Sequence, residues 1–251
     1  MALINPSKRI RKMATHINEI GSLIHSVADI GTDHGYLPFL LHETGTVKRS
    51  ILCDINKGPL ENAKKTFEHL SLKADCEFRL GSGMVPLKPA EVDLVVIAGM
   101  GGGLIRDILS YDLSKTKRFK YFLLQPMTEQ DRLREWLEEQ GLEIVWDLFF
   151  TDLNKHYELI LVTTLKDIPE LNTLYEDKLL LFNGDMEFGR KIRRDNLVEY
   201  KAFLAHKARK YTLIREAISG EANLPDNDKL TLCNTKLAQL QTILTSLSKE
   251  V

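Results

Sequence analysis

Cysteines and long apolar segments are both scarce in this sequence. The chain of 251 residues has three cysteines, at positions 53, 76 and 233, and their spacing fits neither a disulfide framework nor a zinc site. No apolar run approaches the roughly 20 residues that cross a bilayer, and residues 1–12 lack the apolar core and cleavage site of a signal peptide. We therefore expect a cytoplasmic protein with no membrane segment. The net charge of −1 points to no particular partner.

The sequence also lacks the Gly-x-Gly-x-x-Gly fingerprint of dinucleotide-binding proteins. Residues 27–38 instead read Val-Ala-Asp-Ile-Gly-Thr-Asp-His-Gly-Tyr-Leu-Pro, which is an apolar run, a glycine-containing turn and the start of a helical segment. This order is the opening unit of a doubly wound α/β sheet, in which ligands bind outside the carboxyl ends of the strands. A carboxylate at the strand end, Asp29, would repel a pyrophosphate but suits the cationic amino group of S-adenosylmethionine. We therefore favour that cofactor.

Strand and helix patterns alternate over the first two thirds of the chain. Strands are predicted at 27–30, 50–55, 76–80, 92–98, 121–124, 142–151 and 156–164. The turn 152–155 is too short for a crossover, so the last two strands should be an antiparallel pair. The prediction is an α/β fold with a seven-stranded, mostly parallel sheet whose last strand is reversed.

The strand patterns disappear near Pro169, which we interpret as a domain boundary between 1–168 and 169–251. Residues 170–182 and 186–219 have helical patterns, and apolar residues recur by three and four over 230–247. The two long patterns are joined by a short loop. They predict a C-terminal α-helical hairpin resembling a coiled coil.

The first candidate site combines acids and glycines at the strand ends. Asp29 would receive the amino group of the cofactor, and Asp54, about 20 residues beyond the glycine turn, would accept hydrogen bonds from ribose hydroxyls. The adenine is expected near 81–84, and the cofactor carboxylate at the backbone amides that begin the following helix. A generic α/β turn is the alternative interpretation. The candidate cofactor-binding residues are Asp29, Gly31, Thr32, Gly35, Asp54, Ile55, Gly81, Ser82, Gly83, Met84, Ala98, Gly99 and Met100.

Asp33 and Gln125 are the candidate catalytic residues, each with a second interpretation. Asp33 either faces the reacting centre or caps the following helix, and His34 beside it is either a base or a surface residue. The Gln125 amide either reads a base edge or satisfies backbone groups near Pro126. The segment 99–103 lacks the Asn/Asp-Pro-Pro-Tyr sequence that amine methyltransferases place there, so it supplies no stacking ring.

Basic residues gather in two segments, one near the N-terminus and one in the C-terminal region. Residues 189–215 contain nine basic and two acidic residues, and we place the basic ones on one helix. Such a run is either a solvated face or a stripe that contacts phosphates, and we favour phosphate contacts. No RNA-binding module signature is present. The candidate RNA-binding residues are Lys8, Arg9, Arg11, Lys12, Arg190, Lys191, Arg193, Arg194, Lys207 and Lys210.

Six motifs together resemble one family. They are Asp-Ile-Gly-Thr-Asp-His-Gly-Tyr-Leu-Pro (29–38), Cys-Asp-Ile-Asn (53–56), Gly-Ser-Gly (81–83), Ala-Gly-Met-Gly-Gly (98–102), Leu-Gln-Pro (124–126) and His-Tyr-Glu (156–158). In this order, over roughly residues 6–165, they resemble the TrmK family of bacterial tRNA methyltransferases. Ser82 departs from the acid that commonly meets the cofactor adenine at this point.

The resemblance implies a class I, Rossmann-like methyltransferase that uses S-adenosyl-L-methionine to methylate N1 of adenine 22 in tRNA. It implies direct in-line transfer, which depends mainly on alignment. Asp33 would stabilise the cationic product ring, and Gln125 or a backbone carbonyl of 98–100 would orient the amine. The target adenine has to leave its stack. We expect no metal and a monomer.

Two other functions are compatible with parts of the sequence. A small-molecule methyltransferase would use the helical hairpin only to dimerise, and the excess of basic residues argues against it. A non-enzymatic RNA-binding protein would have lost the cofactor site. The acids Asp29 and Asp54 argue against that function.

Overall fold

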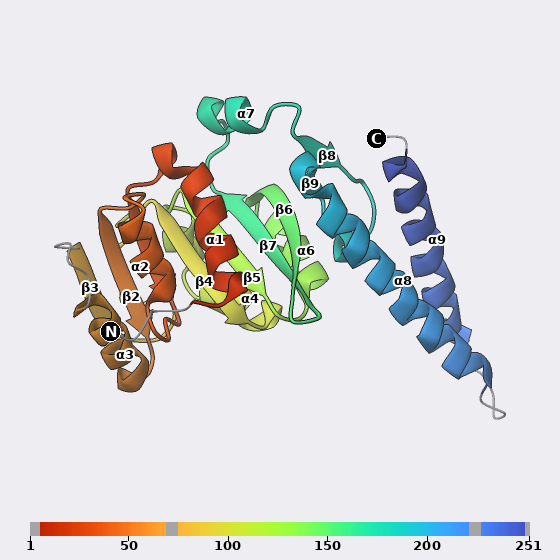
Figure 1. Ribbon diagram of the computed structural model, residues 1–251, viewed down its shortest axis with the longest axis horizontal. Coiled ribbons are helices and arrows are strands. Elements are labelled where there is room, and N and C mark those ends of the chain that lie inside the picture. Colours follow the sequence, from red (N-terminus) through yellow and green to blue (C-terminus); the bar gives the residue numbers. More distant parts are fainter. Residues whose placement is uncertain (1–5, 69–74, 221–226, 249–251) are drawn as a thin grey trace.

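The computed structural model describes residues 6–68, 75–220 and 227–248, and within them one nine-stranded sheet forms the centre (Figure 1). The strand order is β3-β2-β1-β4-β5-β7-β6-β9-β8. The strands are β1 (Ser26–Ile30), β2 (Arg49–Asp54), β3 (Asp75–Leu80), β4 (Leu94–Met100), β5 (Tyr121–Pro126), β6 (Glu143–Asp152), β7 (Lys155–Thr163), β8 (Leu179–Leu181) and β9 (Lys191–Arg193).

The strand order reverses between β1 and β4, and this reversal locates the site. Strands β3, β2, β1, β4 and β5 are parallel neighbours, so their carboxyl ends lie at one edge. The pairing of β4 with β5 shifts register between Ala98 and Met100, at Gly99 with φ +77°. Strand β7 is antiparallel to both β5 and β6, as the short turn predicted. In such sheets ligands bind at the edge where the order reverses.

Helices cover both faces of the sheet. The α-helices of the described residues are α1 (Lys8–Glu19), α2 (Tyr36–Glu43), α3 (Lys57–Glu68), α4 (Gly102–Ser110), α5 (Leu113–Thr116), α6 (Gln130–Glu139), α7 (Pro169–Tyr175), α8 (Leu197–Gly220) and α9 (Asn227–Leu247), of which the last two pack at the end of the sheet. Helices α1, α2 and α7 share one apolar cluster with the sheet, and α4 and α6 share another. Val27 and Ala28 of β1 are both fully buried but point into different clusters. Burial on both faces explains why the central strands are almost continuously apolar.

The prediction of seven strands was wrong, because β8 and β9 extend the sheet beyond β6. The sequence pattern predicts helix at both positions. Each contains three residues, too few to show a periodic pattern. Helix α8 consequently begins at Leu197 rather than near 186, and Gly189, with φ +83°, lies in the irregular segment before it.

Two long helices follow, and α8 lies beside α9 (Figure 1). Tyr200, Phe203 and Leu204 of α8 share an apolar cluster with Leu240 and Ile243 of α9. That cluster also includes residues of β6, β8 and β9, so the helices are packed onto the end of the sheet. The helices are confirmed, the coiled-coil character of the pair stays a prediction, and the predicted loop at 221–226 lies outside the described residues.

A buried ionic cluster holds the segment that precedes α8. Arg134 on α6 donates from Nε to Asp147 Oδ1 (2.8 Å) and from Nη2 to Glu158 Oε2 (2.6 Å), and all three side chains are almost fully buried. Asp147 Oδ2 also accepts from the backbone N–H groups of Arg190 and Lys191. The cluster thus ties the segment before β9 to the sheet.

No helix in the described parts of the chain is both long and apolar enough for a membrane crossing.

Candidate functional site

Two acids lie at the tips of adjacent parallel strands. Asp29 pairs in register with Leu52 of β2, and Asp54 ends β2 two residues later. The turn after β1 is held against β2, because Gly31 N–H and the next N–H both donate to Cys53 O, at 2.8 and 3.1 Å. Asp54 Oδ1 accepts from Asn56 N at 2.7 Å, which leaves a second carboxylate oxygen. The structure brings together the two acids that the sequence analysis had paired.

Burial disfavours the charged form of Asp29. It raises the pKa of this carboxyl to about 6. The hydrogen bond from the Thr32 side chain and the positive charge of Arg9 oppose this rise, and the negative charge of Asp54 adds to it. A cationic ligand would stabilise the ionised form of Asp29, because its positive charge compensates for the hydration that the carboxylate loses on burial.

The turn after β1 requires glycine for steric reasons. Gly31 has φ +75°, and a Cβ there would lie 2.3 Å from Met100 Cε. Gly35, with φ +65°, is the N-cap of α2, and a Cβ there would lie 2.8 Å from Leu52 Cδ2. Because no side chain caps α2, the alternative interpretation of Asp33 as a helix cap is wrong.

Asp33 and His34 lie at the mouth of a pocket of about 220 Å³. The Asp33 side chain is 75% exposed and its Oδ2 lies 3.5 Å from His34 Nε2. The His34 ring stacks on Tyr36, with 5.1 Å between centroids and 10° between planes. The structure therefore places an aromatic pair in this pocket, whereas the segment 99–103 supplies no stacking ring. The pocket is completed by Asp29, Gly31 and Ala98, and by residues of α1.

A second cavity, of about 500 Å³, lies beside the segment expected to receive adenine. Ser82, Gly83 and Met84 line it together with Ile108 and Tyr111 of the α4 region, which the sequence analysis did not identify. Gly81 N–H donates to Asp54 O at 2.9 Å, so this segment is fixed to the tip of β2. Ile55, predicted beside the same ligand, is 64% exposed.

Gln125 is fully buried, and its amide is bonded within the protein. Its Oε1 accepts from Arg9 Nη1 at 2.7 Å and from Gly99 N at 3.2 Å, and its Nε2 donates to Pro126 O at 3.1 Å. This arrangement matches the second interpretation, in which the amide satisfies groups near Pro126. It also places Arg9, predicted to contact RNA, beside the strand tips.

Of the other predicted RNA-binding residues, some are bonded within the protein and some are exposed. Lys8 Nζ donates to Thr151 O at 2.6 Å, and Lys207 pairs with Glu187 at 2.9 Å. The prediction that residues 190–194 lie on the long helix was wrong, since they form β9 and the turns around it. Arg11, Arg194 and Lys210 are exposed, and Lys12 is half-buried.

Three cations of the β9 segment are engaged by acids. Arg190 Nε lies 2.8 Å from Glu138 Oε1, and Lys191 Nζ lies 2.8 Å from Glu143 Oε1. Arg193 is buried and pairs with Glu19 and Asp195. Its guanidinium also lies 5.6 Å from the ring centroids of both Trp146 and Tyr175.

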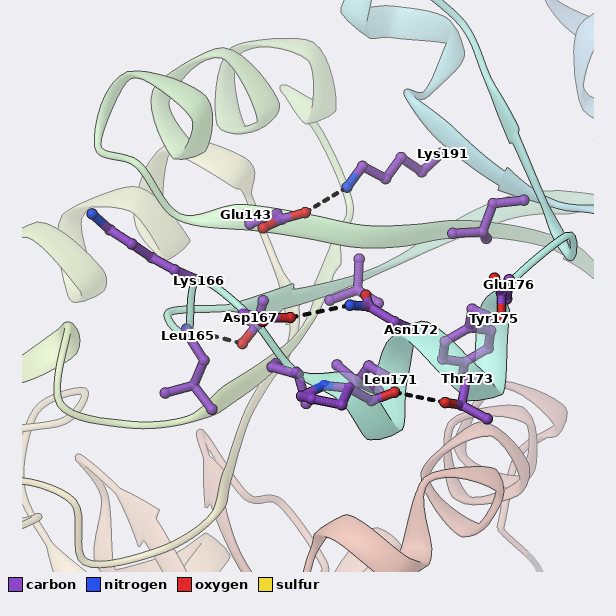
Figure 2. A pocket seen from close by; sticks show the side chains of 15 residues that line it. Glu143, Leu165, Lys166, Asp167, Leu171, Asn172, Thr173, Tyr175, Glu176 and Lys191 are labelled. Atoms are coloured by element: carbon purple, nitrogen blue, oxygen red, sulfur yellow. Dashed lines mark hydrogen bonds and ion pairs between the residues drawn. The ribbon is translucent and has the colours of Figure 1, made fainter.

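A cavity of about 650 Å³ lies near α7, and Figure 2 shows its lining. It opens where β6 begins and β7 ends, which is the sheet edge opposite the strand tips. Two of its polar pairs are satisfied internally, Lys191 with Glu143 and Asn172 with Asp167. The strand-tip pocket, which contains the buried acid Asp29, is the better candidate site.

Known proteins resemble this chain in sequence and in structure. A family model described as a methyltransferase domain matches residues 6–160. The tRNA (adenine(22)-N(1))-methyltransferase of Bacillus subtilis is 32% identical over 154 residues, which span 61% of this chain and 63% of the relative, less than two thirds of its length.

Two crystal structures cover nearly the whole chain. Streptococcus pneumoniae Sp1610 in complex with S-adenosyl-L-methionine has a TM-score of 0.72 and 25% identity, covering 96% of this chain and 100% of the other. The B. subtilis M1A22 tRNA methyltransferase TrmK has a TM-score of 0.71 and 25% identity, covering 96% and 99%. The Rossmann-like fold and the resemblance to TrmK are confirmed, and the chain belongs to the methyltransferase domain family.

Proposed function

We propose that the protein transfers a methyl group from S-adenosyl-L-methionine to N1 of adenine 22 in bacterial tRNA. The observation that carries the proposal is the placement of Asp29 and Asp54 at the tips of adjacent parallel strands, beside a turn that Gly31 leaves open. The B. subtilis relative has this activity in its name, and the S. pneumoniae structure holds this cofactor. An enzyme of this kind would act in the cytoplasm, where tRNA is found.

The strand-tip residues suit this cofactor. Asp29 would hold its amino group and Asp54 its ribose hydroxyls. The buried Thr32 hydroxyl, which faces the Asp29 carboxyl, would add a polar contact for the same ligand. The exposed Ile55 and the cavity beside Met84 would accept a flat adenine. The cofactor supplies an electrophilic methyl group.

The acceptor nitrogen requires no strong base. N1 of adenine is neutral and has an in-plane lone pair, so alignment supplies most of the rate. The product ring is cationic, and the exposed carboxylate of Asp33 at the pocket mouth would stabilise it. Because Gln125 is buried and engaged, backbone carbonyls of 98–100 are better placed than its side chain to orient the amine.

The C-terminal region, 169–251, and the start of α1 would hold the tRNA. Lys8, Arg11 and Lys210 are exposed cations on α1 and α8, and contacts with phosphates need such residues. The target adenine is stacked within folded tRNA and has to leave its stack before it reaches the strand tips.

The test is incubation of the protein with unmodified tRNA and methyl-labelled S-adenosylmethionine, followed by mapping of the label. We expect label on N1 of adenine 22 and none with Asp29→Ala, which should lose cofactor binding while its circular dichroism spectrum stays that of the parent. Label on another nucleotide, or full activity of the variant, would contradict the proposal. Steep loss of RNA affinity with added salt would separate it from a small-molecule methyltransferase.

A further inference from the structure

The rings of His156 and His206 contact each other where β7 meets α8. Their centroids lie 4.4 Å apart, with 39° between the ring planes. His206 is exposed on α8, whereas His156 is half-buried at the start of β7. Nδ1 of His156 lies 3.2 Å from Thr151 Oγ1, and the ring of Phe203 meets His156 edge-on at 6.3 Å. His156 is thus held in place, and Nε2 is the ring atom that could donate to a ligand.

This histidine pair lies at the edge of the sheet that carries the strand tips. Strand β7 runs antiparallel to β5, so it begins where β5 ends, and β5, β4 and β1 are parallel. His156 is therefore on the same edge as Asp29. Thr151, which contacts His156, also accepts through its carbonyl oxygen from Lys8 Nζ at 2.6 Å. A continuous row of contacts thus leads from α1, which lines the strand-tip pocket, to α8.

Most charged groups that face the pair are cations. The pKa of His206 is lowered by loss of hydration and by three cations of α8, which are Lys207, Lys210 and Arg209. Burial and then the neighbouring His206 lower the pKa of His156, and Lys207 lowers it further, whereas the Glu199 carboxylate raises it. Both rings therefore favour the neutral form in the free protein, and an anion placed against them would favour protonation.

We infer that the His156–His206 pair contacts a phosphate group of the tRNA backbone and takes up a proton when it does so. The inference rests on the proposed function and adds a contact between the cations of α8 and those of α1. A protonated imidazole donates a charge-assisted hydrogen bond to a phosphate oxygen. A lysine would make this contact at every pH near neutrality, whereas a histidine makes it more tightly as pH falls. Neither histidine is among the residues that the sequence predicts to bind RNA.

Binding of unmodified tRNA without cofactor, at pH 6 and at pH 8 and constant ionic strength, tests the inference. The absence of cofactor removes the ligand that Asp29 is proposed to hold. We expect roughly fivefold higher affinity at pH 6, for a phosphate that raises the proton affinity of the pair about tenfold. The slope of log affinity against log salt should be steeper at pH 6 by about 1. Calorimetry in two buffers of different ionisation enthalpy should show proton uptake.

Substitutions at the exposed histidine separate charge from packing. His206→Gln should lose most of the pH dependence and most of the proton uptake. His206→Lys should bind tRNA at pH 8 about as tightly as the parent binds it at pH 6, because lysine stays charged at both values. His25→Gln is the control. His25 is exposed just before β1, at the opposite edge of the sheet, so this variant should keep the full pH dependence.

Three outcomes would overturn the inference. The first is equal affinity of the parent for tRNA at pH 6 and pH 8. The second is a His206→Gln protein whose affinity depends on pH as strongly as that of the parent. The third is loss of the pH dependence in His34→Gln, which would place the titrating group at the mouth of the strand-tip pocket. A parent that bound no tRNA at either pH would contradict the proposed function itself, which is distinct from all three.

Discussion

Gly31 and Met100 meet across the tips of β1 and β4, so closely that a Cβ on Gly31 would lie 2.3 Å from Met100 Cε. The contact explains why the turn is both open to ligands and intolerant of side chains. Met100 is flexible and can move, but the φ of +75° at Gly31 remains unfavourable for any other residue.

Gly31→Ala should therefore have two separable effects. The backbone strain should cost about 1 kcal/mol of folding free energy, and the displaced Met100 should lower affinity for S-adenosylhomocysteine. Gly45→Ala is the matched control, since Gly45 has φ +73° and nothing within 4 Å of its Cβ. Thermal unfolding should show similar losses in both variants, whereas calorimetry should show an affinity loss only for Gly31→Ala. Equal ligand affinity in the two variants would show that the Met100 contact is irrelevant to binding.

The pKa of about 6 at Asp29 predicts a pH dependence of cofactor binding. Only the ionised carboxylate attracts the ammonium group, so affinity for S-adenosylhomocysteine should be about tenfold lower at pH 5 than at pH 7 and level above pH 7. Rising pH has the opposite effect on the folding stability that Asp29 contributes. A raised carboxyl pKa favours the folded state at low pH, and this contribution is lost as pH rises from about 4 through 6.

Asp29→Asn serves as the control for this pH dependence, because it cannot ionise. Its affinity should be low and nearly constant from pH 5 to 7. Calorimetry and thermal unfolding at several pH values measure both effects. A parent protein whose affinity did not change between pH 5 and 7 would contradict the role given to Asp29.

The buried cluster of Arg134, Asp147 and Glu158 predicts a large loss of stability. Arg134→Ala would leave two buried acids without their cation, which costs about 3–5 kcal/mol. Arg132→Ala is the control on the same helix, because Arg132 is 72% exposed and its pair with Glu129 lies at the surface. That pair should contribute less than about 1 kcal/mol. Denaturant titration measures both values, and a small loss for Arg134→Ala would mean that the acids become protonated or hydrated at little cost.

The strand-tip acids were predictable because their signal is local. Asp29 and Asp54 each end an apolar run, and parallel strands bring such ends to one edge without further information. The bond between Arg9 and Gln125 joins residues 116 positions apart, and no local pattern reports it. Strand β9 was missed because it exists through pairing with β8 and, at one residue, with β6, although Gly189 was a local sign that a helix could not continue there.

The sequence predicts that Lys210 and Lys191 both contact RNA. The structure places them in different surroundings, so their substitutions should affect tRNA binding differently. Lys210 is exposed on α8, whereas Lys191 is paired with Glu143 beside the cavity of Figure 2, on the sheet edge away from the strand tips. We expect Lys210→Ala to weaken tRNA binding and to reduce the slope of log affinity against log salt by about 1, as loss of one phosphate contact requires. Lys191→Ala should leave the slope unchanged.

Filter binding at several salt concentrations measures these slopes. Because a lysine-to-alanine change also alters the net charge of the protein, Lys191→Ala controls for that general effect. Equal slopes for both variants and the parent would remove Lys210 from the contact surface. A reduced slope for Lys191→Ala alone would mean that tRNA approaches the edge of the sheet shown in Figure 2, and the proposed contact of tRNA with Lys210 of α8 would be wrong.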